Sequence, residues 1–233
     1  MKIKIYESTF GNDKFKLSTP NLFYSVLKNI PDNSSILDFG CGSGICYKNK
    51  RIMNLIEKKN LLVTGIDIDS FAIDEFKKNL KLSLSTDKIN LMCGNILKEQ
   101  FNKKFNYVIF SESAPLLKKC FISEVISHIK MNLLDSSGKV IFINNLVENP
   151  QFFVSFIKPK LKYITTLDFG RVLTIEEFNN LAVANKLKIS FEILDSMTVE
   201  EIAILYNIGF IYKTISRLGF KNYDVNQYKI TME

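Results

Sequence analysis

Three glycines and an aspartate follow one another closely in a segment that could bind a ligand. Residues 36–44 read Ile-Leu-Asp-Phe-Gly-Cys-Gly-Ser-Gly, an apolar strand that leads into a glycine-rich turn. Glycine accepts backbone angles that other residues avoid, and it lets a ligand approach the main chain. The helix expected after the turn would present free N–H groups to an anionic group. The pattern predicts a cofactor site that contains Asp38, Gly40, Gly42 and Gly44.

The spacing of these residues indicates which cofactor they suit. The dinucleotide fingerprint is G-x-G-x-x-G, whereas this turn is G-x-G-x-G and has Ile45 at the place of the third fingerprint glycine. Asp38 stands two residues before the first glycine, where a carboxylate suits an ammonium better than a pyrophosphate. S-adenosylmethionine carries an ammonium and a sulfonium but no phosphate. The spacing therefore favours S-adenosylmethionine over a dinucleotide.

This segment closely resembles the first motif of class I S-adenosylmethionine-dependent methyltransferases, and the resemblance extends over about residues 35–145. In that family the second strand ends in an acidic residue that binds both ribose hydroxyls. Here residues 63–67, Val-Thr-Gly-Ile-Asp, supply Asp67. The resemblance also implies that Ile68 flanks the adenine. As an alternative, Asp67 would only cap the next helix, a role that Asp69 or Ser70 can also fill.

The ends of the third and fourth strands continue the resemblance. The family has Gly-Asp after the third strand, whereas residues 92–96 read Met-Cys-Gly-Asn-Ile. The Asn95 oxygen can still accept from the adenine amine, although a turn or cap role fits it almost as well. The resemblance thus implies a set of residues that bind the cofactor: Asp38, Gly40, Cys41, Gly42, Gly44, Asp67, Ile68, Asn95, Ile96 and Ser111.

The fourth strand ends in Ser-Glu-Ser-Ala, residues 111–114, which in the family lie beside the transferred methyl group. Members that act on nucleobase or glutamine amides often carry Asn/Asp-Pro-Pro-aromatic there, and this chain does not. Its residues look more like the Ser-x-Asp-Ala ends of small-molecule methyltransferases, with Ser113 in place of Asp. Glu112 is the first candidate for a catalytic base and Tyr6 the second. Glu112 as a solvated loop acid is the alternative.

The elements that position these residues alternate along the chain. Apolar strands are expected over residues 35–39, 61–66, 89–92, 107–110, 139–144, 188–194 and 224–231, and residues 2–6 fit a further short strand. Helices are expected over 21–30, 45–59, 71–80, 121–134 and 174–184, the last opened by a capping box of Thr174 and Glu177. This alternation, with the resemblance, predicts a Rossmann-like, doubly wound α/β fold. Its mostly parallel seven-stranded sheet would have an antiparallel last strand and helices on both faces.

One domain over residues 1–233 accounts for the length. Within it we expect an N-terminal cap over 1–34, a cofactor-binding core over 35–145, and substrate-side elements with the closing strands over 146–233. The apolar stretch within 198–220 fits a core helix, a cover of the substrate pocket, a homodimer face or a membrane-surface patch.

Composition narrows the function further. The net charge is +7, but all except three of the 31 basic residues are lysine, and no run of five basic residues occurs. Such scattered lysines are more typical of a solvated surface than of a nucleic-acid track. Four cysteines without C-x-x-C spacing and a single histidine argue against disulfides and a metal site. Because the sequence shows neither a signal peptide nor a long uncharged apolar run, a cytoplasmic protein is expected.

Taken together, the residues predict an S-adenosylmethionine-dependent methyltransferase for a small-molecule amine or hydroxyl. An RNA or protein methyltransferase is one alternative, supported by the positive charge. The others are a non-catalytic cofactor-binding interaction protein and a dinucleotide oxidoreductase. The acceptor and the oligomeric state leave no signal in the sequence.

Overall fold

The structure is a computed structural model that describes residues 19–80, 86–111, 113, 117, 119–147, 174–198 and 224–233. Tyr6 and Glu112, the two predicted catalytic residues, lie outside the described residues. So do the predicted strand at 2–6, most of the predicted N-terminal cap and residues 199–220 of the apolar stretch.

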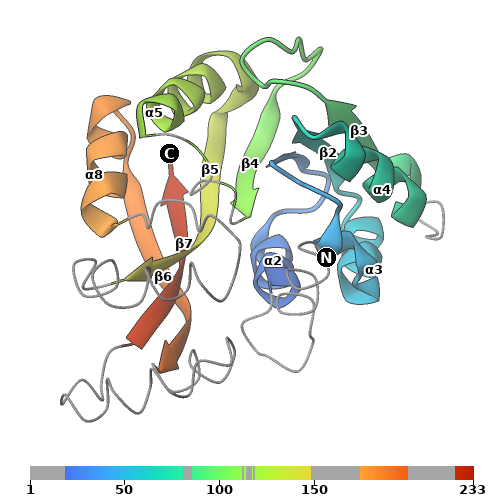
Figure 1. Ribbon diagram of the computed structural model, residues 1–233, viewed down its shortest axis with the longest axis horizontal. Helices are drawn as coiled ribbons and strands as arrows, with labels where there is room; N and C mark the ends of the chain where they lie inside the picture. The colour runs from blue at the N-terminus through green and yellow to red at the C-terminus, as the bar shows by residue number, and fades with distance from the viewer. Residues whose placement is uncertain are drawn as a thin grey trace.

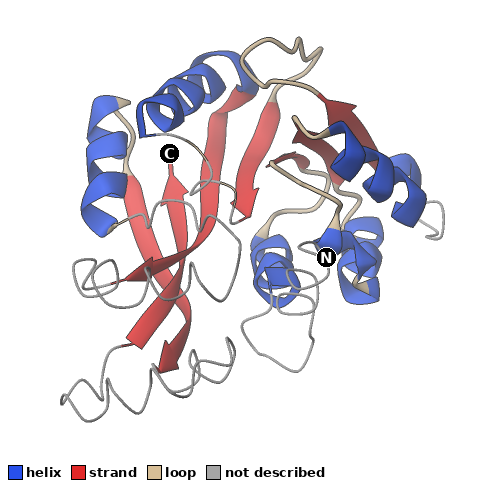
Figure 2. Cartoon of the chain, viewed as in Figure 1, coloured by secondary structure: helices blue, strands red, loops and turns tan. Residues whose placement is uncertain are grey.

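Seven described strands form one sheet in the order β3-β2-β1-β4-β5-β7-β6. Neighbouring strands from β3 to β5 pair in parallel, and β7 lies antiparallel between β5 and β6 (Figures 1 and 2). The strands are β1 (Ser35–Phe39), β2 (Leu62–Asp67), β3 (Ile89–Cys93), β4 (Phe105–Ser111), β5 (Leu134–Val147), β6 (Ile189–Thr198) and β7 (Asp224–Met232). The predicted fold class is confirmed.

Helices cover both faces of this sheet. On one side, α2 (Thr19–Asn29), α3 (Lys50–Lys58) and α4 (Ser70–Leu80) pack together with a short 3₁₀ helix η1 (Ile45–Lys48). On the other side lie α5 (Lys119–His128), a π-helical turn η4 (Ile129–Leu133) and α8 (Ile175–Ala184) (Figure 1). A second 3₁₀ turn, η2 (Thr86–Lys88), precedes β3. No helix among the described residues is long and apolar enough to cross a membrane.

Alternation along the strands divides the core into two apolar clusters. Leu37 and Phe110 pack with α5 and α8, whereas Ile36, Val63 and Ile109 pack with α2, α3 and α4. Successive side chains of a strand point to opposite faces, so every second residue belongs to the same cluster. This alternation also determines the face on which the polar residues at the strand ends lie.

Two predicted helices are wrong in their bounds. The single helix expected over 45–59 is divided at Asn49, which adopts extended angles (φ −80°, ψ 114°) and accepts a hydrogen bond from the Arg51 N–H at 2.9 Å. Asparagine favours such a cap over a helix interior because its side chain competes for main-chain N–H groups. The helix expected to run to 134 stops being α-helical at His128, and β5 already begins at Leu134, which pairs with Phe105 before a register shift.

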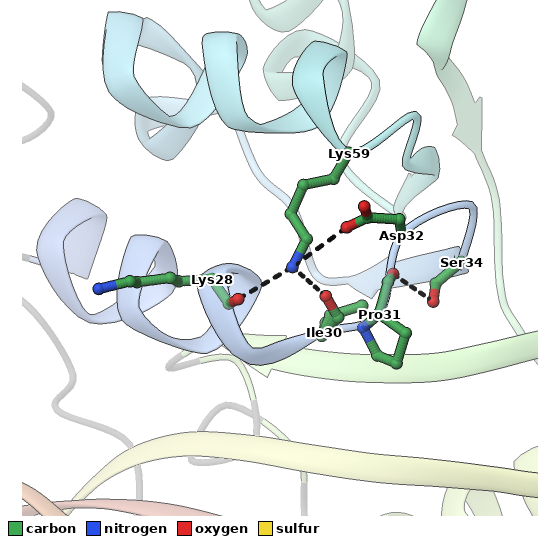
Figure 3. Close-up of polar contacts among 6 residues, drawn as sticks. All are labelled: Lys28, Ile30, Pro31, Asp32, Ser34 and Lys59. Carbon is green, nitrogen blue, oxygen red and sulfur yellow. Dashed lines mark hydrogen bonds and ion pairs between the residues drawn. The ribbon is translucent and has the colours of Figure 1, made fainter.

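The Lys59 side chain caps the end of α2, the helix that precedes β1. Lys59 follows α3, and its ammonium group donates to the carbonyl oxygens of Lys28, at 2.9 Å, and Ile30 at the end of α2 (Figure 3). It also pairs with Asp32 at 3.7 Å. These contacts satisfy C-terminal carbonyl groups and hold the end of α2 against the end of α3. The predicted capping box of α8 is confirmed, with the Glu177 N–H donating to Thr174 Oγ1 at 3.1 Å.

Candidate cofactor site

The alternation places three polar side chains on one face of the sheet. Asp38 lies two residues after Ile36, Asp67 lies four after Val63, and Ser111 lies two after Ile109. Ile36, Val63 and Ile109 all belong to the cluster that packs with α2, α3 and α4. All three therefore share the face covered by α2, α3 and α4. They lie toward the carboxyl ends of β1, β2 and β4, where the strand order reverses beside β1. Ligands of open α/β sheets bind at such a switch point.

The glycine turn leaves space for a ligand at its middle residue. Gly42 and Gly44 both adopt left-handed backbone angles, with φ of 54° and 70°. A Cβ on Gly44 would lie 2.3 Å from the Phe76 ring, whereas a Cβ on Gly42 would meet nothing within 4 Å. Gly44 is thus required for packing, and Gly42 borders open space. The turn is anchored by the Gly40 N–H, which donates to the Ile66 carbonyl oxygen at 2.8 Å.

Asp67 is held in place by two main-chain donors. Its Oδ2 accepts from the Gly42 N–H and its Oδ1 from the Asp69 N–H, each at 2.9 Å. A carboxylate oxygen has a second lone pair, so both oxygens can still accept from a ribose hydroxyl. The helix cap belongs to Asp69, whose Oδ1 accepts from the Phe71 N–H at 2.9 Å. The structure therefore assigns the capping of α4 to Asp69 rather than to Asp67.

Asp38 is a buried carboxyl group with one satisfied oxygen. It is 3% exposed, and Oδ2 accepts from the Tyr47 hydroxyl at 2.8 Å. Oδ1 is buried and has no hydrogen-bond partner among the described residues. Burial raises the pKa of Asp38 to about 7, the Tyr47 hydrogen bond opposes that rise, and the charge of Asp67 adds to it. A buried acceptor without a donor fits a cationic ligand group, so these residues fit the ammonium of S-adenosylmethionine.

The hydroxyl groups of Ser111 and Ser113 differ in their hydrogen bonding. The hydroxyl of Ser113 donates to the Phe39 carbonyl oxygen at 2.7 Å, which ties the end of β4 to the end of β1. The hydroxyl of Ser111 is buried without a partner among the described residues. Two unsatisfied oxygen atoms, one on β1 and one on β4, therefore lie on the same face at neighbouring strand ends.

The residues predicted to contact adenine differ in exposure. Ile68, which precedes α4, is 75% exposed, and Phe71 in the first turn of α4 is 85% exposed. By contrast, Ile96 is 2% exposed and packs in the core, so its main chain is the part that a ligand can reach. The Asn95 Oδ1 accepts from the Leu97 N–H at 3.0 Å and thus supports a local turn. Its contact with an adenine amine stays a prediction.

The Cys41 thiol lies inside the turn but is not a nucleophile. A Cβ on Gly65 would be 2.9 Å from its sulfur, which shows how closely the turn packs on β2. Burial raises the pKa of the Cys41 thiol far above its usual range, and the charges of Asp38 and Asp67 raise it further. Because only the thiolate attacks, a raised pKa argues against a nucleophilic thiol. The predicted place of Cys41 in the cofactor site stays a prediction. Over the described part of the chain, no group of three His, Cys, Asp or Glu side chains is placed to hold a metal ion.

Three residues near the site have no signal in the sequence. Tyr47 reaches Asp38 from η1, Phe71 is exposed beside Ile68, and Glu99 lies across Gly94, where a Cβ would be 2.2 Å from its Oε1. Each is an ordinary residue for its element. Their side-chain contacts and exposure become visible only in the folded chain.

The fold and this site together define a Rossmann-like protein that binds a nucleoside cofactor with a cationic group at the switch point of its sheet. The family model for the methyltransferase small domain matches residues 1–152. The chain belongs to this family, which confirms the predicted recognition as a class I methyltransferase that uses S-adenosylmethionine.

Individual relatives resemble the chain over different parts. A ribosomal protein L11 methyltransferase of Fusobacterium nucleatum is 32% identical over 118 residues, 50% of this chain and 34% of that protein. A tRNA1(Val) (adenine(37)-N6)-methyltransferase of Vibrio vulnificus is 23% identical over 165 residues, 65% of this chain and 67% of that one. A SAM-dependent methyltransferase from Archaeoglobus fulgidus has a similar fold, with a TM-score of 0.64 and 16% identity over 100% of this chain and 99% of that one. The chain spans about a third of the length of the Fusobacterium relative.

Proposed function

We propose that this protein transfers the methyl group of S-adenosylmethionine to an acceptor bound beside the end of β4. The observation that carries the proposal is the buried Oδ1 of Asp38, which has no hydrogen-bond partner among the described residues. Asp38 would bind the ammonium, Asp67 the ribose hydroxyls, and Ile68 would flank the adenine. The bound cofactor supplies a methyl carbon activated by the sulfonium, so the protein contributes positioning and the exclusion of water.

We further propose that the acceptor is a small molecule with an amine or hydroxyl group. The Ser-Glu-Ser-Ala end of β4 lacks the Asn/Asp-Pro-Pro-aromatic motif of enzymes that act on nucleobase or glutamine amides. An ammonium or hydroxyl acceptor must lose a proton on methylation. Glu112, with Tyr6 as second candidate, stays the predicted base.

A second candidate acceptor is a component of the translation machinery. The relatives named above include a methyltransferase for a ribosomal protein and one for a tRNA adenine. The first match covers 50% of this chain and the second 65%.

Isothermal titration with S-adenosylhomocysteine and NAD tests the cofactor assignment. We expect binding of S-adenosylhomocysteine and none of NAD. Asp67→Ala should weaken binding at least about 10-fold, because hydrogen bonds to a charged group contribute about 1.5–3 kcal/mol each. The matched control is Asp69→Ala, which removes the cap of α4 two residues away and should cost about 1 kcal/mol of stability but leave affinity unchanged. Binding of NAD alone would reject the proposal.

The acceptor class is tested by transfer of a tritium-labelled methyl group into fractions of the source cell. Label in the small-metabolite fraction supports the first candidate, and label in RNA or protein supports the second. Cofactor binding without transfer into any fraction would instead support a non-catalytic cofactor-binding protein. Glu112→Gln and Tyr6→Phe should slow the transfer if either residue is the base.

A further inference from the structure

Tyr47 lies beneath the glycine turn in a setting that fixes its hydroxyl group. Its buried ring packs edge-on against Phe23 of α2 at 5.5 Å and tilted against Phe76 of α4 at 4.8 Å. Phe76 in turn fills the space beside Gly44. Because rings from two helices hold Tyr47 from either side, its hydroxyl position is set by the core rather than by a mobile side chain.

That hydroxyl bonds to one particular oxygen of Asp38. Tyr47 donates to Oδ2 at 2.8 Å, whereas Oδ1 has no partner among the described residues. A carboxyl group held through one oxygen has a defined plane and presents the other oxygen in a defined direction. The bond therefore orients Asp38 and leaves Oδ1 to accept from a ligand.

Among the described residues, the titratable groups that interact with Asp38 are Tyr47, Asp67 and Cys41. Burial, followed by the charge of Asp38, raises the pKa of Tyr47 well above its usual value, so the phenol stays a donor. The pKa of the Cys41 thiol is also raised by burial, so the thiol stays neutral. Asp67 repels the ionised form of Asp38, and the Tyr47 hydrogen bond is the contribution that favours it. Without that bond, burial and like charge would both act against ionisation.

We propose that Tyr47 is a positioning residue, whose hydroxyl group holds Oδ2 of Asp38 and thereby presents Oδ1 to the ammonium of the cofactor. This inference rests on the proposed function, because it takes the ammonium of S-adenosylmethionine as the partner of Oδ1. It adds a role for a residue outside the glycine motif. Asp38 and Tyr47 then act together, with Tyr47 orienting the carboxyl group that binds the ammonium.

The test compares Tyr47→Phe with wild type by isothermal titration between pH 6 and 9. The variant keeps the ring and removes only the hydroxyl. For S-adenosylhomocysteine we expect affinity to rise with pH and level off above about pH 7 in wild type. In the variant the rise should move to higher pH, with binding about 10-fold weaker at pH 7. Binding at pH 7 should also release more protons in the variant, which titrations in buffers of different ionisation enthalpy measure.

Methylthioadenosine is the matched control ligand, because it carries the adenosine and sulfur but no ammonium. Its affinity should be the same in wild type and Tyr47→Phe. An equal loss for both ligands, or an unchanged pH profile for S-adenosylhomocysteine, would overturn the role of Tyr47. Failure of wild type to bind either ligand would instead overturn the proposed function. If Tyr47→Phe does not fold, the wild-type pH profile still tests the pair of Tyr47 and Asp38. Asp38→Asn should abolish the pH dependence for S-adenosylhomocysteine and leave methylthioadenosine unaffected, and a wild-type affinity that does not change with pH would overturn the inference.

Discussion

At the scale of single residues, two glycines with the same backbone conformation have different tasks. Gly42 and Gly44 both need left-handed angles, but only Gly44 is pressed against another side chain, the Phe76 ring. The open side of Gly42 faces the region where the cofactor is proposed to lie. The two positions therefore separate the requirements of folding from those of binding.

Alanine at position 44 should mainly lower stability, whereas alanine at position 42 should mainly weaken cofactor binding. Gly44→Ala adds a steric clash with Phe76 to the backbone strain, and we expect it to lower the free energy of unfolding by about 3 kcal/mol. Gly42→Ala adds strain of about 1 kcal/mol, but its methyl group enters the ligand space and should weaken S-adenosylhomocysteine binding at least about 10-fold. Urea unfolding and titration of each variant measure the two effects. Equal losses of stability would contradict this account.

At the scale of elements, lysine side chains close the ends of helices. The ammonium of Lys59 bonds to carbonyl oxygens at the end of α2, that of Lys104 to Asn132 at 2.5 Å, and that of Lys130 to Asn185 at 2.6 Å. Cations suit helix C-termini because free carbonyl groups and the helix dipole lie there. These three lysines thus have a structural role, and the interpretation of the remaining positive charge stays a prediction.

Removal of one such ammonium should loosen the contact between α2 and α3. Lys59→Met keeps the apolar stem but loses two hydrogen bonds to carbonyl groups (Figure 3), and we expect unfolding to require about 1–2 kcal/mol less free energy. Lys58→Met, on the exposed side of the same helix, serves as the control and should unfold like wild type. Thermal unfolding of the three proteins decides the point, and identical midpoints for Lys59→Met and wild type would speak against a capping role.

At the scale of the whole molecule, the buried acid of the site should set how stability depends on pH. Folding raises the pKa of Asp38 from 3.8 to about 7, chiefly through burial. The folded protein therefore binds this proton more tightly than the unfolded chain does. Stability from this group is present below about pH 4, falls as pH rises to about 7, and then levels off. The cost of a charged Asp38 is on the order of a few kcal/mol, and a bound ammonium would offset it.

Urea unfolding of wild type and Asp38→Asn at pH 5 and pH 8 measures this cost. We expect wild type to lose more stability between the two values than the variant, whose amide does not ionise. S-adenosylhomocysteine should stabilise wild type at pH 8 more than the variant, which lacks the charge that pairs with the ammonium. If wild type and Asp38→Asn lost the same stability between pH 5 and pH 8, the ionised Asp38 would carry no such cost. The single-domain organisation, the cytoplasmic location and a homodimer stay predictions at this scale.

Much of the fold follows from local patterns. The run at 35–39 is β1 residue for residue, the capping box at Thr174 begins α8, and the glycine spacing predicts a turn with left-handed angles. Such features depend on neighbours in sequence, which is why a single chain reveals them. The candidate cofactor residues on β1 and β2 belong to the same category, because strand ends and the turn motif mark Asp38 and Asp67.

Contacts between distant segments decided the remainder. The start of β5 at Leu134 is one example, because Leu134 pairs with Phe105 of β4. The last strand inserts between β5 and β6 instead of lying at the edge. The partner of Asp38 is likewise a tyrosine that only the packing of α2 and α4 orients. Sequence pattern determined which residues could do chemistry. Tertiary structure determined their partners, because burial and hydrogen bonding depend on side chains that meet only when the chain is folded.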